Sequence, residues 1–169
     1  MELFEAIHTR RSIRKFEDAP VSDELVRDIL DAAMSAPSAG NAQPWHFIVI
    51  RDKALREAIP AFSPYAGMIV HAPLGILVCA ELTLEKYPGY WVQDCSAAMQ
   101  NLLLAAHGKG LGAVWTGVHP MADREEGFRK LLALPDTVKP LGFAVLGRPA
   151  QESGRRDRFK PERIHADRW

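Results

Sequence analysis

The sequence has few cysteines and no excess of charge, and both shortages narrow the possible functions. Two cysteines, Cys79 and Cys95, occur among 169 residues, in apolar segments without CxxC spacing. The six histidines also lack the spacing of metal ligands, so we expect neither a disulfide framework nor a metal site. Lys plus Arg and Asp plus Glu both number 21, which gives a net charge of zero. Nucleic-acid-binding proteins normally carry a basic excess, so no nucleic-acid partner is expected.

Targeting segments and uninterrupted hydrophobic runs are also missing. The first residues, MELFEAIHTRR, contain no apolar core of a signal peptide, which predicts a cytoplasmic protein. Residues 58–80 form a stretch of 23 residues without Asp, Glu, Lys or Arg, long enough to cross a bilayer. Prolines and His71 interrupt this stretch. We therefore expect a loop followed by a buried strand, and no membrane association.

Length and composition predict a single domain spanning residues 1–169. A chain of this length with 47% hydrophobic residues can bury a substantial core. Residues 150–169 differ, because they hold six basic and four acidic residues and, as large hydrophobic ones, only Phe159, Ile164 and Trp169. Such a segment cannot form its own core. It is either a disordered tail or an extension anchored by these side chains, for example on a second subunit.

The hydrophobic pattern predicts four strands interleaved with helices. Ser22 is a candidate N-cap for a helix that ends before Pro37. Residues 91–107 form the longest predicted helix, which is apolar on most sides and suits a core or a subunit interface. The apolar run 74–80 is typical of a central strand covered on both faces. Further strands are expected at 45–50, 112–118 and 141–147, and further helices at 52–59 and 123–134.

The first candidate site is the basic segment RRSIRKF at residues 10–16. Arg10, Arg11 and Arg14 lie there together with Ser12 and without an acid. Guanidinium groups bind phosphate oxygens in pairs, and a hydroxyl adds a further donor. The segment predicts an anion site, although a solvated basic helix end would explain the same charges.

The second candidate site is the loop PSAGNAQPW at residues 37–45. Asn41 and Gln43 place two side-chain amides beside the strand that starts at Trp45. Amides both donate and accept hydrogen bonds, so they can recognise the edge of a planar heterocycle. The following proline favours an extended Gln43. A loop that merely terminates a helix, with Asx-turn chemistry, is equally compatible.

Two later segments offer further ligand contacts. WTGV at 115–118 combines the stacking face of Trp115 with Gly117, where a ligand can approach the backbone closely. Arg148 follows the last predicted strand, where ligand sites often gather, and can complete a phosphate site begun by Arg10. The alternative for Trp115 is a buried residue of the core, and the alternative for Arg148 is an ordinary surface residue.

Taken in order, RRSIRKF, PSAGNAQPW, WTGV and GRP resemble the nitroreductase family of FMN-dependent oxidoreductases. The closing DRFKPERIHADRW resembles the end of its short members, so the resemblance extends from Arg10 to Trp169. It implies an α+β fold with a central mixed or antiparallel sheet flanked by helices. It also implies a homodimer that exchanges its C-terminal extensions, residues 150–169, and holds two non-covalent FMN at its interface.

The resemblance also implies the cofactor contacts. Arg10 and Ser12 match positions toward the FMN phosphate and ribityl chain, and Arg14 matches a position near the pyrimidine end of the flavin. The loop PSAGNAQPW at 37–45 matches the loop that the other subunit lays against the flavin. The Gly117 N–H matches the group that faces flavin N5. The implied cofactor-binding residues are Arg10, Arg11, Ser12, Arg14, Pro37, Ser38, Ala39, Asn41, Gln43, Trp115, Thr116, Gly117 and Arg148.

The implied reaction is a ping-pong transfer of a hydride from NAD(P)H through flavin N5 to a small electron acceptor, such as a nitro compound or a quinone. The cofactor carries the reaction, so no catalytic side chain is expected. Reductive dehalogenation, flavin breakdown, flavin storage without turnover and a phospholigand-binding module without flavin remain as alternatives. The short link at residues 81–90 predicts an open substrate pocket with Tyr87, Tyr90 or Trp91 near its rim.

Overall fold

A four-stranded sheet forms the centre of the computed structural model, which describes residues 1–152 and 154–169. All its strand pairs are antiparallel, and the order is β1-β2-β4-β3. The strands are β1 (Trp45–Ile50), β2 (Leu74–Glu81), β3 (Gly112–Gly117) and β4 (Val138–Gly147). The helices are α1 (Leu3–Thr9), α2 (Asp23–Met34), α3 (Lys53–Ala58), α4 (Trp91–Gly108) and α5 (Ala122–Leu132). Short 3-10 helices are Ala39–Asn41, Ile59–Ala61, Pro64–His71, Leu82–Leu84 and Pro161–Arg163. The α+β prediction is confirmed.

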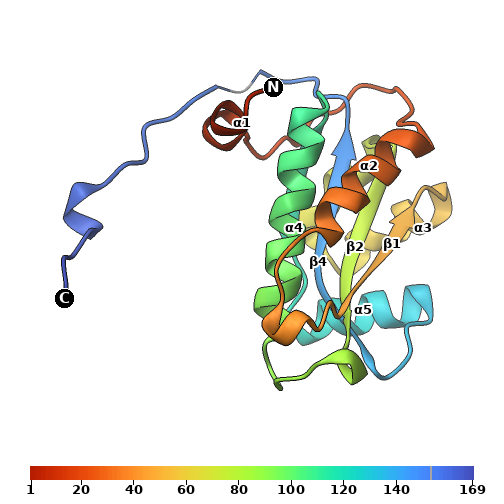
Figure 1. Ribbon diagram of the computed structural model, residues 1–169. Helices are drawn as coiled ribbons and strands as arrows, with labels where there is room; N and C mark the ends of the chain where they lie inside the picture. The colour runs from red at the N-terminus through yellow and green to blue at the C-terminus, as the bar shows by residue number, and fades with distance from the viewer. Residues whose placement is uncertain (153) are drawn as a thin grey trace.

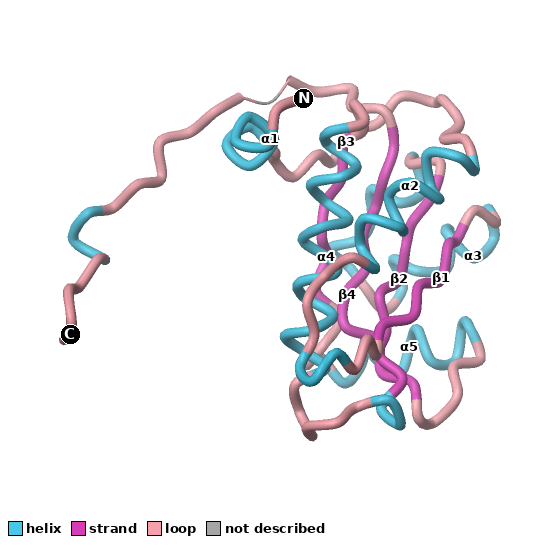
Figure 2. Tube along the Cα trace, in the orientation of Figure 1, coloured by secondary structure: helices cyan, strands magenta, loops and turns pink. Residues whose placement is uncertain are grey.

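Helices cover both faces of the sheet, so the core has two layers (Figure 1). On the α2 and α4 face, Leu74 and Ile76 of β2 join a cluster with Leu102. On the opposite face, Leu77 joins a cluster with Phe128 of α5. Figure 2 shows the strands passing between these helices. Successive β2 side chains alternate between the two layers because a strand has a period of two. The predicted central strand, buried on both faces, is confirmed.

The helix limits follow the predicted signals. The Ser22 hydroxyl accepts a hydrogen bond of 3.3 Å from the Leu25 N–H, as an N-cap does. The stretch 58–80 contains 3-10 turns and then β2, in agreement with the loop and strand expected there. None of the helices in residues 1–152 and 154–169 combines the length and the apolar character needed to cross a membrane.

The C-terminal tail, residues 154–169, runs away from the sheet with one short 3-10 turn (Figure 1). Its large hydrophobic side chains, Phe159, Ile164 and Trp169, are all exposed. They therefore add nothing to the core of their own chain.

Candidate functional site

Two adjoining recesses of about 310 and 400 Å³ lie where the basic segment 10–16 meets the start of the tail. Ser12 and Gln151 line the second recess, and one acid lines each, Asp157 the first and Glu152 the second. The Gln151 Oε1 accepts the backbone N–H groups of Arg14 and Lys15 at 2.8 and 3.0 Å. We call the two together the arginine recess. The arginines that line it are Arg10, Arg11, Arg14, Arg155, Arg156 and Arg158.

The positive charges in the arginine recess oppose one another. Burial lowers the pKa of Arg10, and the charges of Arg11 and Arg158 lower it further. Burial, Arg158 and Arg156 likewise lower the pKa of Arg11. The Arg11 Nε atom is buried without a hydrogen-bond partner among the described residues, and within these residues no acid forms an ion pair with an arginine of the recess. A multivalent anion would relieve this repulsion and supply the missing acceptors.

The basic segment lies along the free edge of β3. Ser12 bridges to Ala113, and the Ile13 N–H donates to the Ala113 carbonyl at 2.9 Å. Alternate residues of an edge strand turn their amide groups away from the sheet. Because the backbone groups of Ala113 face outward, those of Trp115 and Gly117 do so as well. A ligand that starts at the arginine recess and follows this edge for about 13 Å reaches the Gly117 N–H.

The segment WTGV presents an aromatic ring beside this outward edge. Trp115 is 36% exposed, so its alternative interpretation as a core tryptophan is wrong. Its indole ring lies against Gly142, where an added Cβ would come within 2.2 Å of Nε1. Thr116 is buried, and its hydroxyl donates to the Phe143 carbonyl at 2.9 Å. Thr116 therefore anchors β3 to β4 with its side chain.

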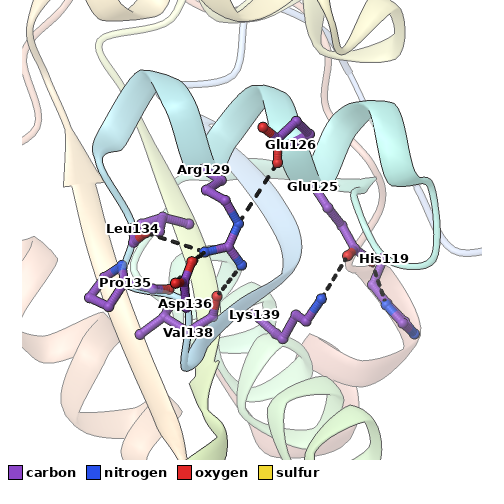
Figure 3. A network of polar contacts seen from close by, with 9 residues as sticks. All are labelled: His119, Glu125, Glu126, Arg129, Leu134, Pro135, Asp136, Val138 and Lys139. Carbon is purple, nitrogen blue, oxygen red and sulfur yellow. Dashed lines mark hydrogen bonds and ion pairs between the residues drawn. The ribbon is translucent and has the colours of Figure 1, made fainter.

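The backbone at and after Gly117 is held by side chains of α5. Arg124 Nη1 donates to the Gly117 carbonyl at 2.8 Å, while its guanidinium lies 5.2 Å from the centre of the Tyr65 ring. Figure 3 shows Glu125 between His119 and Lys139, with Oε1 at 2.7 Å from His119 Nδ1 and Oε2 at 3.6 Å from Lys139 Nζ. These contacts fix the outward edge of β3 at its C-terminal end.

The loop 37–43, called here the amide loop, has a left-handed backbone at three of its residues. The φ angles are +59° at Gly40, +54° at Asn41 and +50° at Gln43. The expectation of an extended Gln43 is therefore wrong, because the Ser38 hydroxyl accepts the Gln43 N–H at 3.0 Å and holds a turned conformation despite the following proline. The side chains of Asn41 and Gln43 are exposed.

One chain does not bring the arginine recess and the amide loop together. Thr9, beside the recess, contacts His107 at the C-terminal end of α4, with Oγ1 and Nε2 2.8 Å apart. The amide loop contacts the other end, where the Ala39 N–H donates to Asp94 Oδ1 at 2.9 Å. Asp94 and His107 lie 13 residues apart in α4, which corresponds to about 20 Å along the helix axis. The amide loop also leads into β1, which lies at the sheet edge opposite β3.

The remaining predicted residues lie apart from the recess. Arg148 is exposed after β4 and is absent from the residues that line the recess, although its carbonyl accepts the Glu17 N–H at 2.9 Å. Tyr87 and Tyr90 are exposed near the amide loop, whereas Trp91 is buried and unsuited to a pocket rim.

The sequence-based prediction missed the tail arginines and Arg124. The signal for the tail arginines is the run RRDR at 155–158, which the composition of residues 150–169 assigns only to a disordered tail or an anchored extension. The sequence gives no comparable sign for Arg124, because its contact with Gly117 depends on how α5 packs. The cysteines offer no nucleophile, since burial raises the pKa of both Cys79 and Cys95 to about 12.

Comparisons with known proteins find matches to both the sequence and the fold of this chain. The model of the nitroreductase family matches residues 7–68 and 64–148. A protein of Methanothermobacter thermautotrophicus, provisionally named NADH dehydrogenase/NAD(P)H nitroreductase, is 55% identical over 169 residues, which cover 100% of this chain and 88% of the relative. A solved structure from Parabacteroides distasonis with the same provisional name has a TM-score of 0.94 at 39% identity, and the match covers 98% of both chains. A provisionally named nitroreductase of Desulfovibrio desulfuricans, solved in complex with FMN, has a TM-score of 0.84 at 34% identity, with 98% of this chain and 96% of that chain covered.

Proposed function

This chain belongs to the nitroreductase family, and on this premise we propose that it is an FMN-dependent oxidoreductase that takes electrons from NAD(P)H and passes them to a small acceptor, such as a quinone or nitro compound. The name of the Methanothermobacter relative and the FMN complex of the Desulfovibrio relative support this class of reaction. The observation that carries the proposal is the arrangement along β3, where the arginine recess lies at one end of an outward edge and Trp115 and Gly117 at the other.

The residues of the recess suit the phosphate end of FMN. Arg10, Arg11 and Ser12 would bind the phosphate from the domain, and Arg156 and Arg158 would bind it from the tail. The orphaned Arg11 Nε and the lowered pKa values of Arg10 and Arg11 both indicate a site in need of an anion. Arg148 remains a proposed phosphate-side residue that the recess geometry does not favour.

The outward edge of β3 suits the flavin ring. The Gly117 N–H would face the reactive edge of the ring, Trp115 would contact the ring, and the Thr116 hydroxyl would keep this part of β3 in place. The resemblance matches Arg14 with a position near the pyrimidine end, where its charge would stabilise the reduced state. Its place in the arginine recess favours the phosphate end instead. FMN, when bound, supplies the two-electron chemistry. The protein supplies binding, orientation and charge.

The amide loop would come from the partner in a homodimer. The recess and the loop contact α4 about 20 Å apart along its axis, and the loop leads into β1 at the sheet edge opposite β3. This separation favours a site in which the loop of a second protomer meets the recess. Each site would then combine Arg10 to Arg14 of one protomer with Pro37, Ser38, Ala39, Asn41 and Gln43 of the other. The side-chain amides of Asn41 and Gln43 are exposed and available for such a contact.

The C-terminal extension, residues 150–169, would pack on the partner. A groove of about 710 Å³ between α2 and β1 is lined by apolar side chains, including Leu30, and by charged residues of both signs, which are Asp23, Asp31, Asp52, Arg27 and Arg51. The tail carries exposed hydrophobic residues that suit the apolar part of this groove. The outer edge of β1, next to the groove, is also open to an added strand in the described residues.

An absorption spectrum of the purified protein, recorded across its size-exclusion peak, tests the cofactor and assembly together. We expect bands of oxidised flavin on a dimer, and steady-state oxidation of NADH or NADPH with a quinone or nitroaromatic acceptor. A flavin-loaded dimer without turnover would indicate a storage protein instead. A well-folded protein that does not take up added FMN would contradict the proposal.

A further inference from the structure

The amide loop has left-handed backbone at three residues. The φ angles are +59° at Gly40, +54° at Asn41 and +50° at Gln43. Glycine and asparagine adopt this region readily, whereas glutamine does so at a cost. The shape of the loop at Gln43 therefore depends on the contacts around it.

Two charged side chains hold the loop by its backbone. Asp94, in the first turn of α4, is 5% exposed and accepts the Ala39 N–H at 2.9 Å. Lys86, in the link before α4, donates from Nζ to the Gly40 carbonyl at 2.6 Å. A buried carboxylate is costly unless it is hydrogen-bonded, so Asp94 and the loop stabilise one another.

The link before α4, residues 81–90, packs on the amide loop and is hydrogen-bonded to the start of α4. An added Cβ at Gly40 would lie 2.9 Å from Tyr87 Cε2 and 3.1 Å from Lys86 Cδ, so the link packs directly on the loop. The Glu85 carboxylate accepts the Trp91 N–H at 2.9 Å and joins the link to the start of α4. The loop, the link and the first turn of α4 therefore form one braced unit.

We propose that Asp94 and Lys86 are positioning residues that keep the amide loop in the shape that binds the flavin of the partner subunit. This inference rests on the proposed function. Neither residue touches the cofactor in this account, since both act through the backbone of Ala39 and Gly40. If the loop is in the binding shape for only a fraction of the time, the apparent affinity falls by that fraction.

The test compares substitutions that remove or keep the acceptor. Asp94→Leu removes it, whereas Asp94→Asn keeps an oxygen that accepts the Ala39 N–H. Lys86→Met removes the second contact, and because Lys86 is exposed, we expect this variant to keep the fold. Lys53→Met, at an exposed lysine of α3, is the matched control. Hydrogen exchange of amides 39–43 is measured in flavin-free full-length protein, and FMN affinity by quenching of flavin fluorescence.

We expect Asp94→Leu and Lys86→Met to speed exchange in the loop while the rest of α4 stays protected, and to weaken FMN binding by about tenfold. Asp94→Asn should restore most of the protection and affinity, and Lys53→Met should match the parent. Unchanged exchange at residues 39–43 in Lys86→Met and Asp94→Leu would overturn the inference, as would unchanged FMN affinity with a loosened loop. If the parent binds no FMN, the proposed function fails, whereas the exchange data still report separately on the two contacts.

Discussion

In the arginine recess, like charges face one another without an ion pair to an acid of the described chain. In the amide loop, protein groups already hold the backbone, through Ser38, Lys86 and Asp94. The first region leaves part of its interaction for a ligand to complete, whereas the second is shaped before a ligand arrives. If the proposed function holds, the charge of the recess decides where FMN binds, and the backbone shape of the loop decides how it lies.

The largest expected effect follows from removing one charge of the recess. Arg10→Ala should weaken FMN binding by about 10- to 100-fold, because a charge-assisted phosphate contact is lost. Riboflavin, which has no phosphate, should bind both proteins with similar affinity. Fluorescence titration measures both ligands. Arg148→Ala is the matched comparison, and a loss as large as that of Arg10→Ala would return Arg148 to the phosphate site.

A simple anion should distinguish the two regions. Inorganic phosphate at about 10 mM should raise the melting temperature of the flavin-free protein by roughly 3–5 °C if its dissociation constant is near 1 mM. Chloride at equal ionic strength should have little effect. Asn41→Ala should retain the phosphate response, and Arg10→Ala should lose most of it. Equal responses in the two variants would remove the distinction drawn between the regions.

A smaller effect concerns His107, which borders the recess. Burial and the charge of Arg10 lower the pKa of His107 from 6.5, Glu5 acts in the opposite direction, and Arg11 lowers it further. The folded state thus binds a proton at His107 less readily than the unfolded state does. Neutral His107 therefore contributes stability above about pH 6.5, and this contribution is lost as pH falls through the folded pKa.

Replacing this histidine checks the sign of the effect. Flavin-free His107→Gln should lose less stability than the parent between pH 7.5 and pH 5, as measured by urea unfolding. His46→Gln, at an exposed histidine of β1, serves as the comparison. A steeper loss of stability in His107→Gln would mean that the recess does not disfavour the charged imidazole.

The sequence predicted the fold well where local signals and burial agree. The Ser22 cap, the apolar run of β2 and the long α4 all lie where expected, because capping and hydrophobic periodicity act over a few residues. The turned conformation of Gln43 could not be predicted. It depends on the Ser38 hydroxyl and on a loop braced by Lys86 and Asp94, which are distant in the sequence.

The candidate site was predicted in pieces. The basic segment and the amide loop were visible as residue types, but their separation by 13 residues of α4, from Asp94 to His107, is a property of the folded chain. The tail arginines were visible as charges, yet only the fold places Arg156 and Arg158 beside Arg10 and Arg11. Long-range packing, and not local propensity, decides such contacts.

The most direct test of a cofactor site shared between chains uses mixed dimers. Protein in which one chain carries Arg10→Ala and the other Asn41→Ala is purified through two different affinity tags, and its bound FMN is measured. Because one site then collects both substitutions and the other has neither, we predict one FMN per dimer with the affinity of the parent. A mixed dimer that binds FMN as poorly as either pure variant would place each site within a single chain and contradict the account.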